Sequence, residues 1–411
     1  MKILVYEYFS GGGFTFEKFS HSILSEGFGM LRTLISDFLA VGHQITTIVD
    51  SRILKLNSLQ IDANHIISIS SLQDLKQTII KLSGEVDAAY IIAPETDGIL
   101  EDILKIIEYA GIISLNCSIG GIAKVSDKLL LNNFLREMDI TTPKTIGFTT
   151  SENFVDIKEK IFKNLCLPII LKPSIGTSGE GVSIIRNEKN LKKAIHKINS
   201  QFKGKKAIAQ EYIKGNSVSV SLLASGNKAI SISLNKQIVT IERTENNSKY
   251  KGGFVPYKTP LKKKCFEISE KIIQSIPGLK GYVGIDLILT DNDVVTLEIN
   301  PRLTTSYIGI RNVVKLNLAQ KIIDCYFNKI LPSEIPTYGY SYFSKIYMKS
   351  PCNNSYRKRR IPKEIIFAPL QLMEARNNCA FVSVKGKTKK ETLKKFCEVK
   401  KEFLKYIKGE N

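Results

Sequence analysis

The sequence predicts a parallel α/β domain followed by an α+β domain built on antiparallel strands. Through residues 3–115, apolar runs typical of strands alternate with apolar residues at helical spacing, which indicates a parallel sheet covered by helices. After residue 168, strand-like runs follow one another across short turns, as they do in hairpins. A hydrophobic content of 43% with 24% charged residues is typical of a globular protein.

Length and composition exclude several classes of protein. A chain of 411 residues is long enough for two or three domains with cores of their own. No apolar run reaches the ~18 residues of a membrane helix, and the amino-terminal MKILVYEYF is expected to be a buried strand rather than a signal peptide. The seven cysteines contain no CxxC pair, which disfavours a disulfide framework and a zinc site. We therefore expect a cytoplasmic protein with no membrane partner.

The first 117 residues form the predicted parallel domain. Strands are expected at 3–8, 45–49, 88–92 and 112–115, with helices at 26–41, 71–82 and 99–110. Three glycines at 11–13 follow the first strand, but they lack the GxGxxG spacing of a dinucleotide site. Ligands bind beyond the carboxyl ends of strands in such sheets, and the loops there are 11–14, 50–52 and 95–97. Each loop fits a structural turn as well as a substrate contact.

The second domain mixes helices and hairpins. A helix is expected from Ser126, as its N-cap, to Met138. Further strands are expected at 168–173, 182–185, 207–213, 218–223 and 229–234, a polar loop at 242–262, and helices at 265–276 and 316–327. A late strand at 381–384 and a basic helix at 389–407 complete the chain.

A phosphate-binding element is indicated at the strand PIILKP and the loop after it. Lys172 stands inside this apolar run, where a buried ammonium needs an anionic partner, although a lysine reaching solvent from the strand end fits equally well. The loop SIGTSGEG, residues 174–181, lets the backbone approach a ligand, and its amides can cradle phosphate oxygens. It is not a Walker loop, because no GKS or GKT follows it into a helix.

A metal site is indicated at the predicted hairpin of residues 283–299. Asp286 precedes its turn, and Glu298 and Asn300 follow on one face of the second strand, so the three side chains should converge. Oxygen ligands of this kind suit Mg²⁺, which also takes waters and substrate phosphates. Arg302 adds a permanent cation suited to a phosphate or carboxylate. A single acidic residue beside a turn would mean little, but three oxygen ligands with an arginine favour the metal site.

Together these motifs resemble the ATP-grasp superfamily. The resemblance covers roughly residues 126–311 and rests on SDK at 126–128, ILKP with its glycine loop, QEYIKG at 210–215, GIDL around Asp286 and EINPR at 298–302. More narrowly, EYFSGGGF, APETDG, SLNKQ and EINPRLTTSY are similar to archaeal tyramine–glutamate ligases and their relatives. The resemblance implies a pre-ATP-grasp domain at 1–117, a two-lobed ATP-grasp domain at 118–330 with lobes of about 118–205 and 206–330, and a basic segment at 331–411 packing on it.

The resemblance also implies roles for individual residues. Lys128 and Lys172 would contact ATP phosphates, Arg302 and Lys172 would act in catalysis, and Asp286, Glu298 and Asn300 would hold two Mg²⁺ ions, with Mn²⁺ as an alternative. The loop glycines Gly176, Gly179 and Gly181 with Ser178 would close over the phosphates. A hinge strand would meet adenine through Gln210, Glu211, Tyr212 and Ile213. The chain lacks the carboxylate that family members often carry near Asn216 and has glutamine where an acidic residue often stands at position 210, which puts the ribose and adenine contacts in doubt.

The expected function is an ADP-forming ligase that joins a carboxylate, such as that of the amino acid glutamate, to an amine through an acyl-phosphate. Its partners would be ATP and small molecules, with a homodimer left open. The net charge of +20 is concentrated in residues 341–411, which hold 18 Lys and Arg against 6 Asp and Glu. A solvated helix face explains this charge more simply than nucleic acid does, because no aromatic-interleaved motif accompanies it. The alternatives are an acidic carrier protein as acceptor, or nucleic-acid binding by the basic segment.

Overall fold

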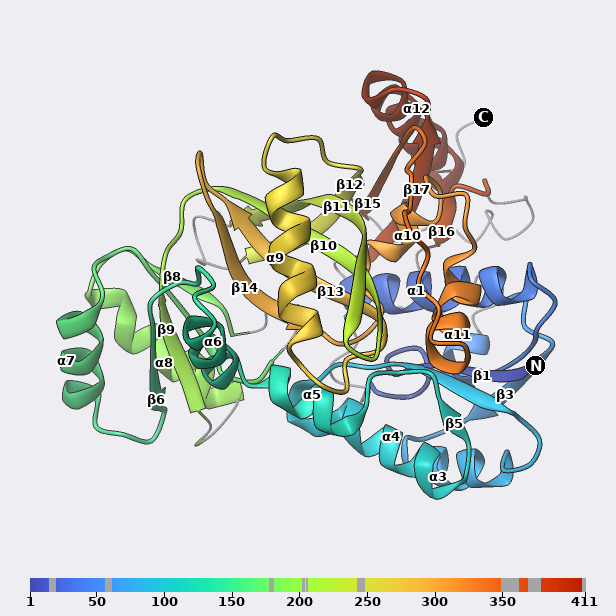
Figure 1. The fold of residues 1–411 in the computed structure, drawn as a ribbon, viewed down its shortest axis with the longest axis horizontal. Coiled ribbons are helices and arrows are strands. Elements are labelled where there is room, and N and C mark those ends of the chain that lie inside the picture. The colour runs from blue at the N-terminus through green and yellow to red at the C-terminus, as the bar shows by residue number, and fades with distance from the viewer. Residues whose placement is uncertain are drawn as a thin grey trace.

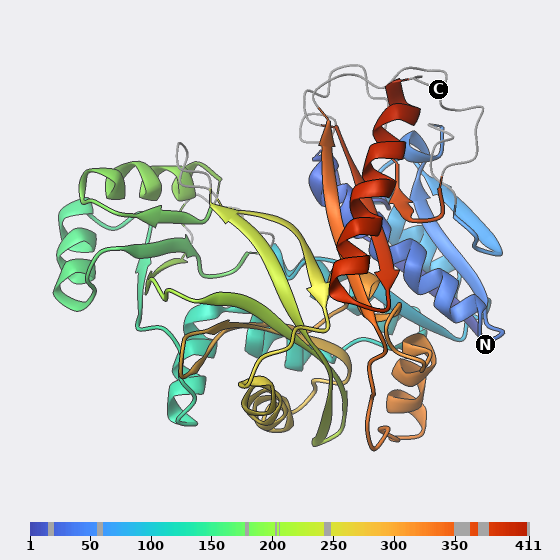
Figure 2. The same cartoon turned by 90° about the horizontal axis from the view of Figure 1, so that it is seen from above.

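The computed structural model describes residues 1–14, 20–55, 61–176, 181–201, 204, 206–241, 248–348, 362–368 and 378–408. These residues form one parallel and two antiparallel sheets (Figures 1 and 2). The four-stranded sheet lies at one end of the molecule, and the parallel sheet lies toward the other end (Figure 1). This arrangement confirms the predicted fold class. Within the described residues, no helix has the length and apolar character needed to cross a membrane.

The parallel sheet has the strand order β3-β2-β1-β4-β5. Its strands are β1 (Lys2–Glu7), β2 (Gln44–Asp50), β3 (His65–Ile69), β4 (Ala88–Ile92) and β5 (Ile113–Ser114), and the helices between them are α1 (His21–Leu39), α2 (Ser51–Leu54), α3 (Gln73–Lys81), the single turn η2 (Thr96–Gly98) and α4 (Ile99–Tyr109). Along β1, Ile3 and Val5 face the core with α1, while Leu4 and Tyr6 face the core with α3 and α4. This alternation covers both faces, as buried parallel sheets require.

The four-stranded sheet is antiparallel, in the order β6-β9-β7-β8. Its strands are β6 (Thr145–Thr149), β7 (Ile169–Pro173), β8 (Ser183–Ile185) and β9 (Lys206–Glu211); α5 (Ile119–Ser126) and α6 (Lys128–Glu137) precede them, and α7 (Phe154–Asn164) and α8 (Lys189–Gln201) lie between them. Ile157, Ile161 and Leu191 of the two covering helices pack with the strands in a small separate core. The predicted N-cap Ser126 is wrong: Ser126 ends α5, and Asp127 caps α6 by accepting from Leu129 N and Leu130 N.

The eight-stranded sheet has the order β14-β13-β10-β11-β12-β15-β17-β16. Its strands are β10 (Asn216–Ser225), β11 (Lys228–Ile241), β12 (Ser248–Val255), β13 (Gly281–Leu289), β14 (Val294–Asn300), β15 (Tyr340–Met348), β16 (Ile365–Phe367) and β17 (Asn378–Gly386), with helices α9 (Lys262–Gln274), α10 (Tyr307–Ile310), α11 (Leu318–Phe327) and α12 (Lys389–Lys408). The carboxyl-terminal segment thus contributes three strands to this sheet. Of these strands, β16 and β17 also contact α1, which Figure 2 shows beside this part of the sheet.

The predicted polar loop at 242–262 is wrong for residues 248–255, which form β12 inside the large sheet. The glycines that suggested a loop are needed for close strand pairing. Gly252 has a φ of +144°, and a Cβ there would lie 2.0 Å from the carbonyl oxygen of Phe343 on β15. Glycine is therefore required at this position, where β12 pairs with β15. Residues 242–247 lie outside the described part of the chain.

Candidate active site

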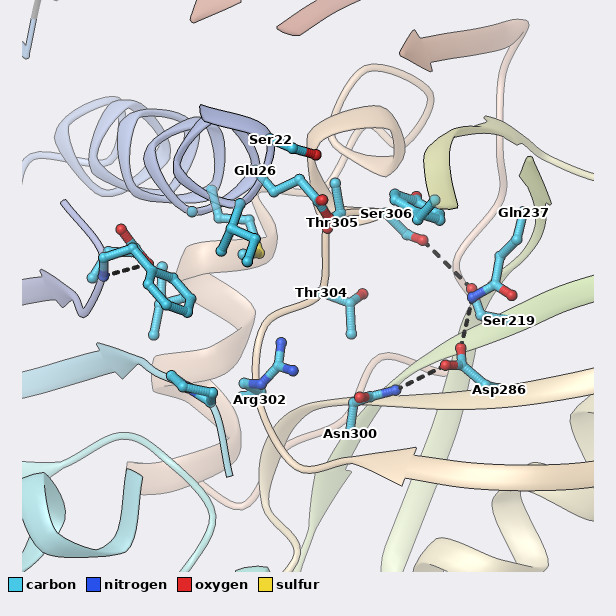
Figure 3. Close-up of a pocket in the computed structure, with 18 of the residues that line it drawn as sticks. Ser22, Glu26, Ser219, Gln237, Asp286, Asn300, Arg302, Thr304, Thr305 and Ser306 are labelled. Carbon is cyan, nitrogen blue, oxygen red and sulfur yellow. Dashed lines mark hydrogen bonds between the residues drawn. The ribbon is translucent and has the colours of Figure 1, made fainter. Parts of the chain in front are cut away.

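Two cavities meet at the β13–β14 hairpin. The N-terminal cavity, of about 310 Å³, lies between the parallel-sheet domain and the large sheet, and the interlobe cavity, of about 280 Å³, lies between the two antiparallel sheets. Both are lined by Gln237, Val239, Asp286 and Glu298. Figure 3 shows the N-terminal cavity with Asp286, Asn300 and Arg302 along one side. The two cavities therefore share part of their walls at this hairpin.

The hairpin brings its two carboxylates together. Asp286 of β13 stands opposite Glu298 of β14, next to a shift in the strand register. Asp286 Oδ1 accepts from Gln237 Nε2 at 2.8 Å, and Asp286 Oδ2 accepts from Asn300 Nδ2 at 3.3 Å. Both carboxylates are enclosed by protein yet open to the cavities. Burial, followed by the charge of Glu298, raises the pKa of Asp286 to about 7, so the metal-free pair tends to hold a proton.

Two lysines lie on the interlobe side of this acidic pair. Asp127 caps α6 and accepts from Ser174 Oγ at 2.5 Å, which ties the start of α6 to the end of β7. The next residue, Lys128, donates from Nζ to Gly176 O at 2.6 Å and lies 3.7 Å from Glu298 Oε2. Burial and the nearby Lys128 charge lower the pKa of Lys172 to about 8, although Glu298 counteracts the shift. Two buried ammonium groups beside one cavity form a site for an anion.

The predicted hinge residues also line the interlobe cavity, as Gln210, Glu211, Tyr212 and Ile213 at and after the end of β9. The Gln210 side chain is turned toward β6, where its Nε2 donates to Thr145 Oγ1 at 2.8 Å. Gly176 lines the cavity as well, and Gly181 directly precedes Val182 in its wall. The other predicted loop residues, Ser178 and Gly179, lie outside the described residues.

Arg302 links the hairpin to the parallel-sheet domain. Its Nε lies 2.9 Å from Glu95 Oε1 in an ion pair that is not aligned as a hydrogen bond. Glu95 belongs to one of the three loops beyond the strand ends, and the residues just before it, Ile92, Ala93 and Pro94, line the N-terminal cavity. In the loop at 50–52, by contrast, Arg52 pairs with Asp50 of its own turn.

Sequence reasoning missed several residues of the N-terminal cavity. These include Glu7 at the end of β1, Glu26 of α1, Gln237 of β11, Tyr250 of β12 and Lys345 of β15. Gln237 lies in the SLNKQ motif, but nothing in the sequence pointed to its bond with Asp286. Glu26 and Lys345 come from distant parts of the chain, so their proximity carries no local sequence signal.

Glu7 gives this cavity a group that titrates near neutral pH. Its carboxylate accepts from Phe9 N, Ser10 N and Ser10 Oγ at 2.6–3.0 Å, and it is almost fully buried. Burial raises the pKa of Glu7 to about 7, with the Ser10 bonds and the Arg302 charge opposing the shift. The folded state therefore holds this proton more tightly than the unfolded chain does, and the resulting stability is lost as the pH rises through about 7.

The Glu7→Gln variant tests this linkage. The unfolding free energy of the wild type minus that of the variant should fall by about 2 kcal/mol from pH 5 to pH 8. The reason is that only the wild type has a carboxyl group at position 7 that loses its proton in this range. Urea denaturation of the nucleotide-free proteins at the two pH values measures it. A difference that stays constant, or grows with pH, would show that Glu7 is ionised throughout this range.

The hairpin fits a hard divalent cation that keeps other ligands. Among the described residues, no three His, Cys, Asp or Glu side chains gather into a metal-binding group. Asp286 and Glu298 supply two carboxylates, and Asn300 supplies an amide whose nitrogen now faces Asp286. A cation here would take the amide oxygen after a turn of that side chain. Its remaining ligands would come from water and phosphate oxygens, which is the usual environment of Mg²⁺.

Two models of known protein families together match most of the chain. Residues 125–306 match the ATP-grasp domain, and residues 43–122 match the pre ATP-grasp 3 domain. The chain is 30% identical to tyramine–L-glutamate ligase of Methanocaldococcus fervens over 314 residues, covering 75% of this chain and 89% of that protein. It is 28% identical to D-alanine–D-alanine ligase of Azobacteroides pseudotrichonymphae, over 54% of this chain and 70% of that protein.

A solved structure agrees in fold. The crystal structure of a putative ATP-grasp superfamily protein from Archaeoglobus fulgidus superposes with a TM-score of 0.61 at 23% identity. The match covers 93% of this chain and 99% of that chain. It therefore extends over the parallel-sheet domain and the carboxyl-terminal strands as well as the two antiparallel sheets.

Proposed function

We propose that this chain, which belongs to the ATP-grasp superfamily and is an ADP-forming carboxylate–amine ligase, joins an amino acid such as glutamate to an amine. ATP-grasp ligases use ATP and a divalent cation, generally Mg²⁺. The observation that carries the proposal is the meeting of two cavities at Asp286 and Glu298. One cavity offers buried lysines to an anion, and the other offers Arg302 to a carboxylate. Glutamate is proposed because the tyramine–glutamate ligase relative covers most of the chain.

The proposed reaction has two balanced steps. A substrate carboxylate oxygen displaces ADP from the γ-phosphorus of ATP and forms an acyl-phosphate. The amine nitrogen then attacks the acyl carbon, phosphate leaves with the bonding electrons, and the nitrogen loses a proton to give the amide. When bound, one or two Mg²⁺ ions, or Mn²⁺ in their place, supply positive charge that neutralises the phosphate oxygens.

The chain's own residues position and neutralise charge in this scheme. Lys128 and Lys172 bind the phosphates from the interlobe cavity, where the hinge residues accept the adenine. Asp286, Glu298 and Asn300 hold the cation where the two cavities join. Arg302, fixed by Glu95, binds the substrate carboxylate and the acyl-phosphate that replaces it. Preorganised charges of this kind act on the transition state without having to rearrange during the reaction.

ADP release measured with glutamate and tyramine tests the function. We expect release to require ATP, Mg²⁺, the carboxylate and the amine together, with one amide formed per ADP. Omitting the amine is the control for simple ATP hydrolysis. If the rate of ADP release depended on neither organic substrate, across a panel of amino acids and amines, the proposal would be contradicted.

The two alternatives have less support. The basic helix α12 turns its apolar side, including Val399 and Phe403, toward the sheet and leaves most of its lysines in solvent. This is the arrangement of a solvated helix face rather than of a built nucleic-acid groove. The names of the matched relatives favour small-molecule ligation over a carrier-protein acceptor.

A further inference from the structure

One wall of the N-terminal cavity is a single face of α1. Ser22, Glu26 and Met30 line the cavity and are spaced four residues apart, so they share one side of the helix. The helix approaches closely because Gly27 has no side chain: a Cβ there would lie 2.4 Å from Glu7 Oε1. The Glu7 and Glu26 carboxylates therefore belong to the same wall.

Glu26 is fixed from two sides. Its Oε2 accepts from Thr305 Oγ1 at 2.9 Å, and its Oε1 pairs with Nζ of Lys345 on β15. Lys345 Nζ also donates to Ser22 Oγ at 2.7 Å and lies 5.9 Å from the centre of the Tyr250 ring. The Lys345 side chain is 2% exposed and that of Glu26 is 19% exposed, so the carboxylate is the part turned to the cavity. Burial alone would lower the pKa of Lys345, but Glu26 raises it, which keeps the ammonium charged.

The Glu26 carboxylate lies across the cavity from the residues proposed to bind the cation and the substrate carboxylate. Figure 3 shows Glu26 on the side opposite Asp286 and Arg302. Tyr250 lines the same cavity as Glu26 and Asp286. Burial, followed by the charges of these two carboxylates, raises the pKa of its phenol. A substrate whose reacting carboxylate meets Arg302 therefore extends its other end toward Glu26.

We propose that the Glu26 carboxylate, oriented by Lys345 and Thr305, binds an ammonium group of the acyl substrate. The inference rests on the proposed ligase function and deepens it. The attacking amine must be unprotonated, and a carboxylate that stabilised its ammonium form would oppose attack. The ammonium at Glu26 thus belongs to the molecule that is activated, an amino acid such as the glutamate proposed above. Lys345 lies beyond the matched ATP-grasp domain, which ends at residue 306, so the carboxyl-terminal segment takes part in substrate selection as a positioning element.

The test compares glutamate with glutarate, the same dicarboxylate without the ammonium group. With ATP and tyramine saturating, wild type is expected to favour glutamate in kcat/KM by about 10- to 100-fold, the range of one charged hydrogen bond. In Glu26→Gln the preference should fall to roughly threefold or less, through a higher KM for glutamate, because a neutral amide no longer attracts the ammonium. The KM for ATP should stay at the wild-type value.

Three further variants separate orientation from general damage. Lys345→Met should lower the preference as Glu26→Gln does, while Lys345→Arg should keep most of it by retaining the ion pair. The matched control is Lys315→Met, which removes an exposed lysine 4.4 Å from the centre of the Tyr338 ring. Lys315 lines neither cavity, so this variant should keep the wild-type preference. Unfolding shifts with a non-hydrolysable ATP analogue confirm that each variant is folded.

The outcomes distinguish this inference from the function on which it rests. Wild type that uses glutamate and glutarate equally, or a Glu26→Gln variant that loses activity on both to the same extent, overturns the ammonium site and leaves the ligase function standing. Wild type that turns over neither acid, nor any other carboxylate, overturns the proposed function and this inference with it.

Discussion

Replacing Glu298 by glutamine is expected to lower kcat for amide formation by about 1,000-fold or more. The change removes a carboxylate that we propose holds the cation, and also the negative charge that faces Lys128 Nζ at 3.7 Å. A bound metal ion contributes several kcal/mol of charge stabilisation in the transition state, and each ~1.4 kcal/mol is a tenfold change in rate. Glutamine keeps the size of the side chain, so the hairpin should remain folded. Single-turnover ADP formation at saturating Mg²⁺ measures the effect on the first step.

The matched control is Glu270→Gln on α9. Glu270 is half-buried and accepts from Ser231 N at 2.8 Å on the same large sheet, but it lines neither cavity. The same chemical change there should leave kcat within about twofold, because the retained amide oxygen can still accept that bond. If Glu298→Gln kept the wild-type turnover and an unchanged Mg²⁺ requirement, the β13–β14 hairpin would not be the site of the catalytic cation.

The sequence predicts the elements whose signals are local. The strand at 88–92 matches β4, and the helix at 99–110 matches α4 to within one residue. Strict burial on both faces and a wide apolar stripe specify these elements without reference to the rest of the chain. The helices α7 and α8 are absent from the sequence prediction. In α7 only Ile157 and Ile161 are fully buried among five charged residues, whereas the core-facing residues of α8 do recur at helical spacing, so its signal was present in the sequence.

The missed strands depend on distant partners. β12 pairs with β11 on one side and with β15 on the other. Its glycines are explained only by Phe343 of β15, with which a Cβ at either position would collide. β15 was absent from the sequence prediction although nine of its residues pair with β17. Strand pairing of this kind depends on packing against neighbours more than on intrinsic preference.

The candidate site divides in the same way. Asp286 and Glu298 meet across one hairpin, so sequence spacing is enough to predict their proximity. The partner of Arg302, by contrast, is Glu95 from the parallel-sheet domain, and the partner of Glu26 is Lys345 from the last segment. Side chains from the parallel-sheet domain, from the strands and loops between β10 and α10, and from the carboxyl-terminal segment therefore build the N-terminal cavity. Its chemistry emerges only from the way those stretches pack together.

Lys172→Met is expected to lower kcat/KM for ATP by about 100- to 1,000-fold, the scale of one preorganised charge on a phosphoryl group. Lys172 is buried at the interlobe cavity beside Lys128, and burial lowers its pKa to about 8. The fold keeps this ammonium in a poorly solvated place, and pairing with an anionic ligand would offset the free energy that its desolvation costs. Methionine has a similar shape and no charge, so weakened binding of an ATP analogue, measured by calorimetry, would report the missing charge.

Lys206→Met provides the comparison for this charge. Lys206 begins β9 in the same four-stranded sheet, but its side chain is exposed and lies outside the cavity lining. Its removal should leave ATP affinity within about twofold, because exposed charges act weakly through solvent. Equal losses in the two variants would mean that ATP responds to the overall charge of the lobe. A loss confined to Lys172→Met, with the glutamate KM unchanged, would assign the phosphate contact to the interlobe cavity and leave substrate selection to the N-terminal cavity.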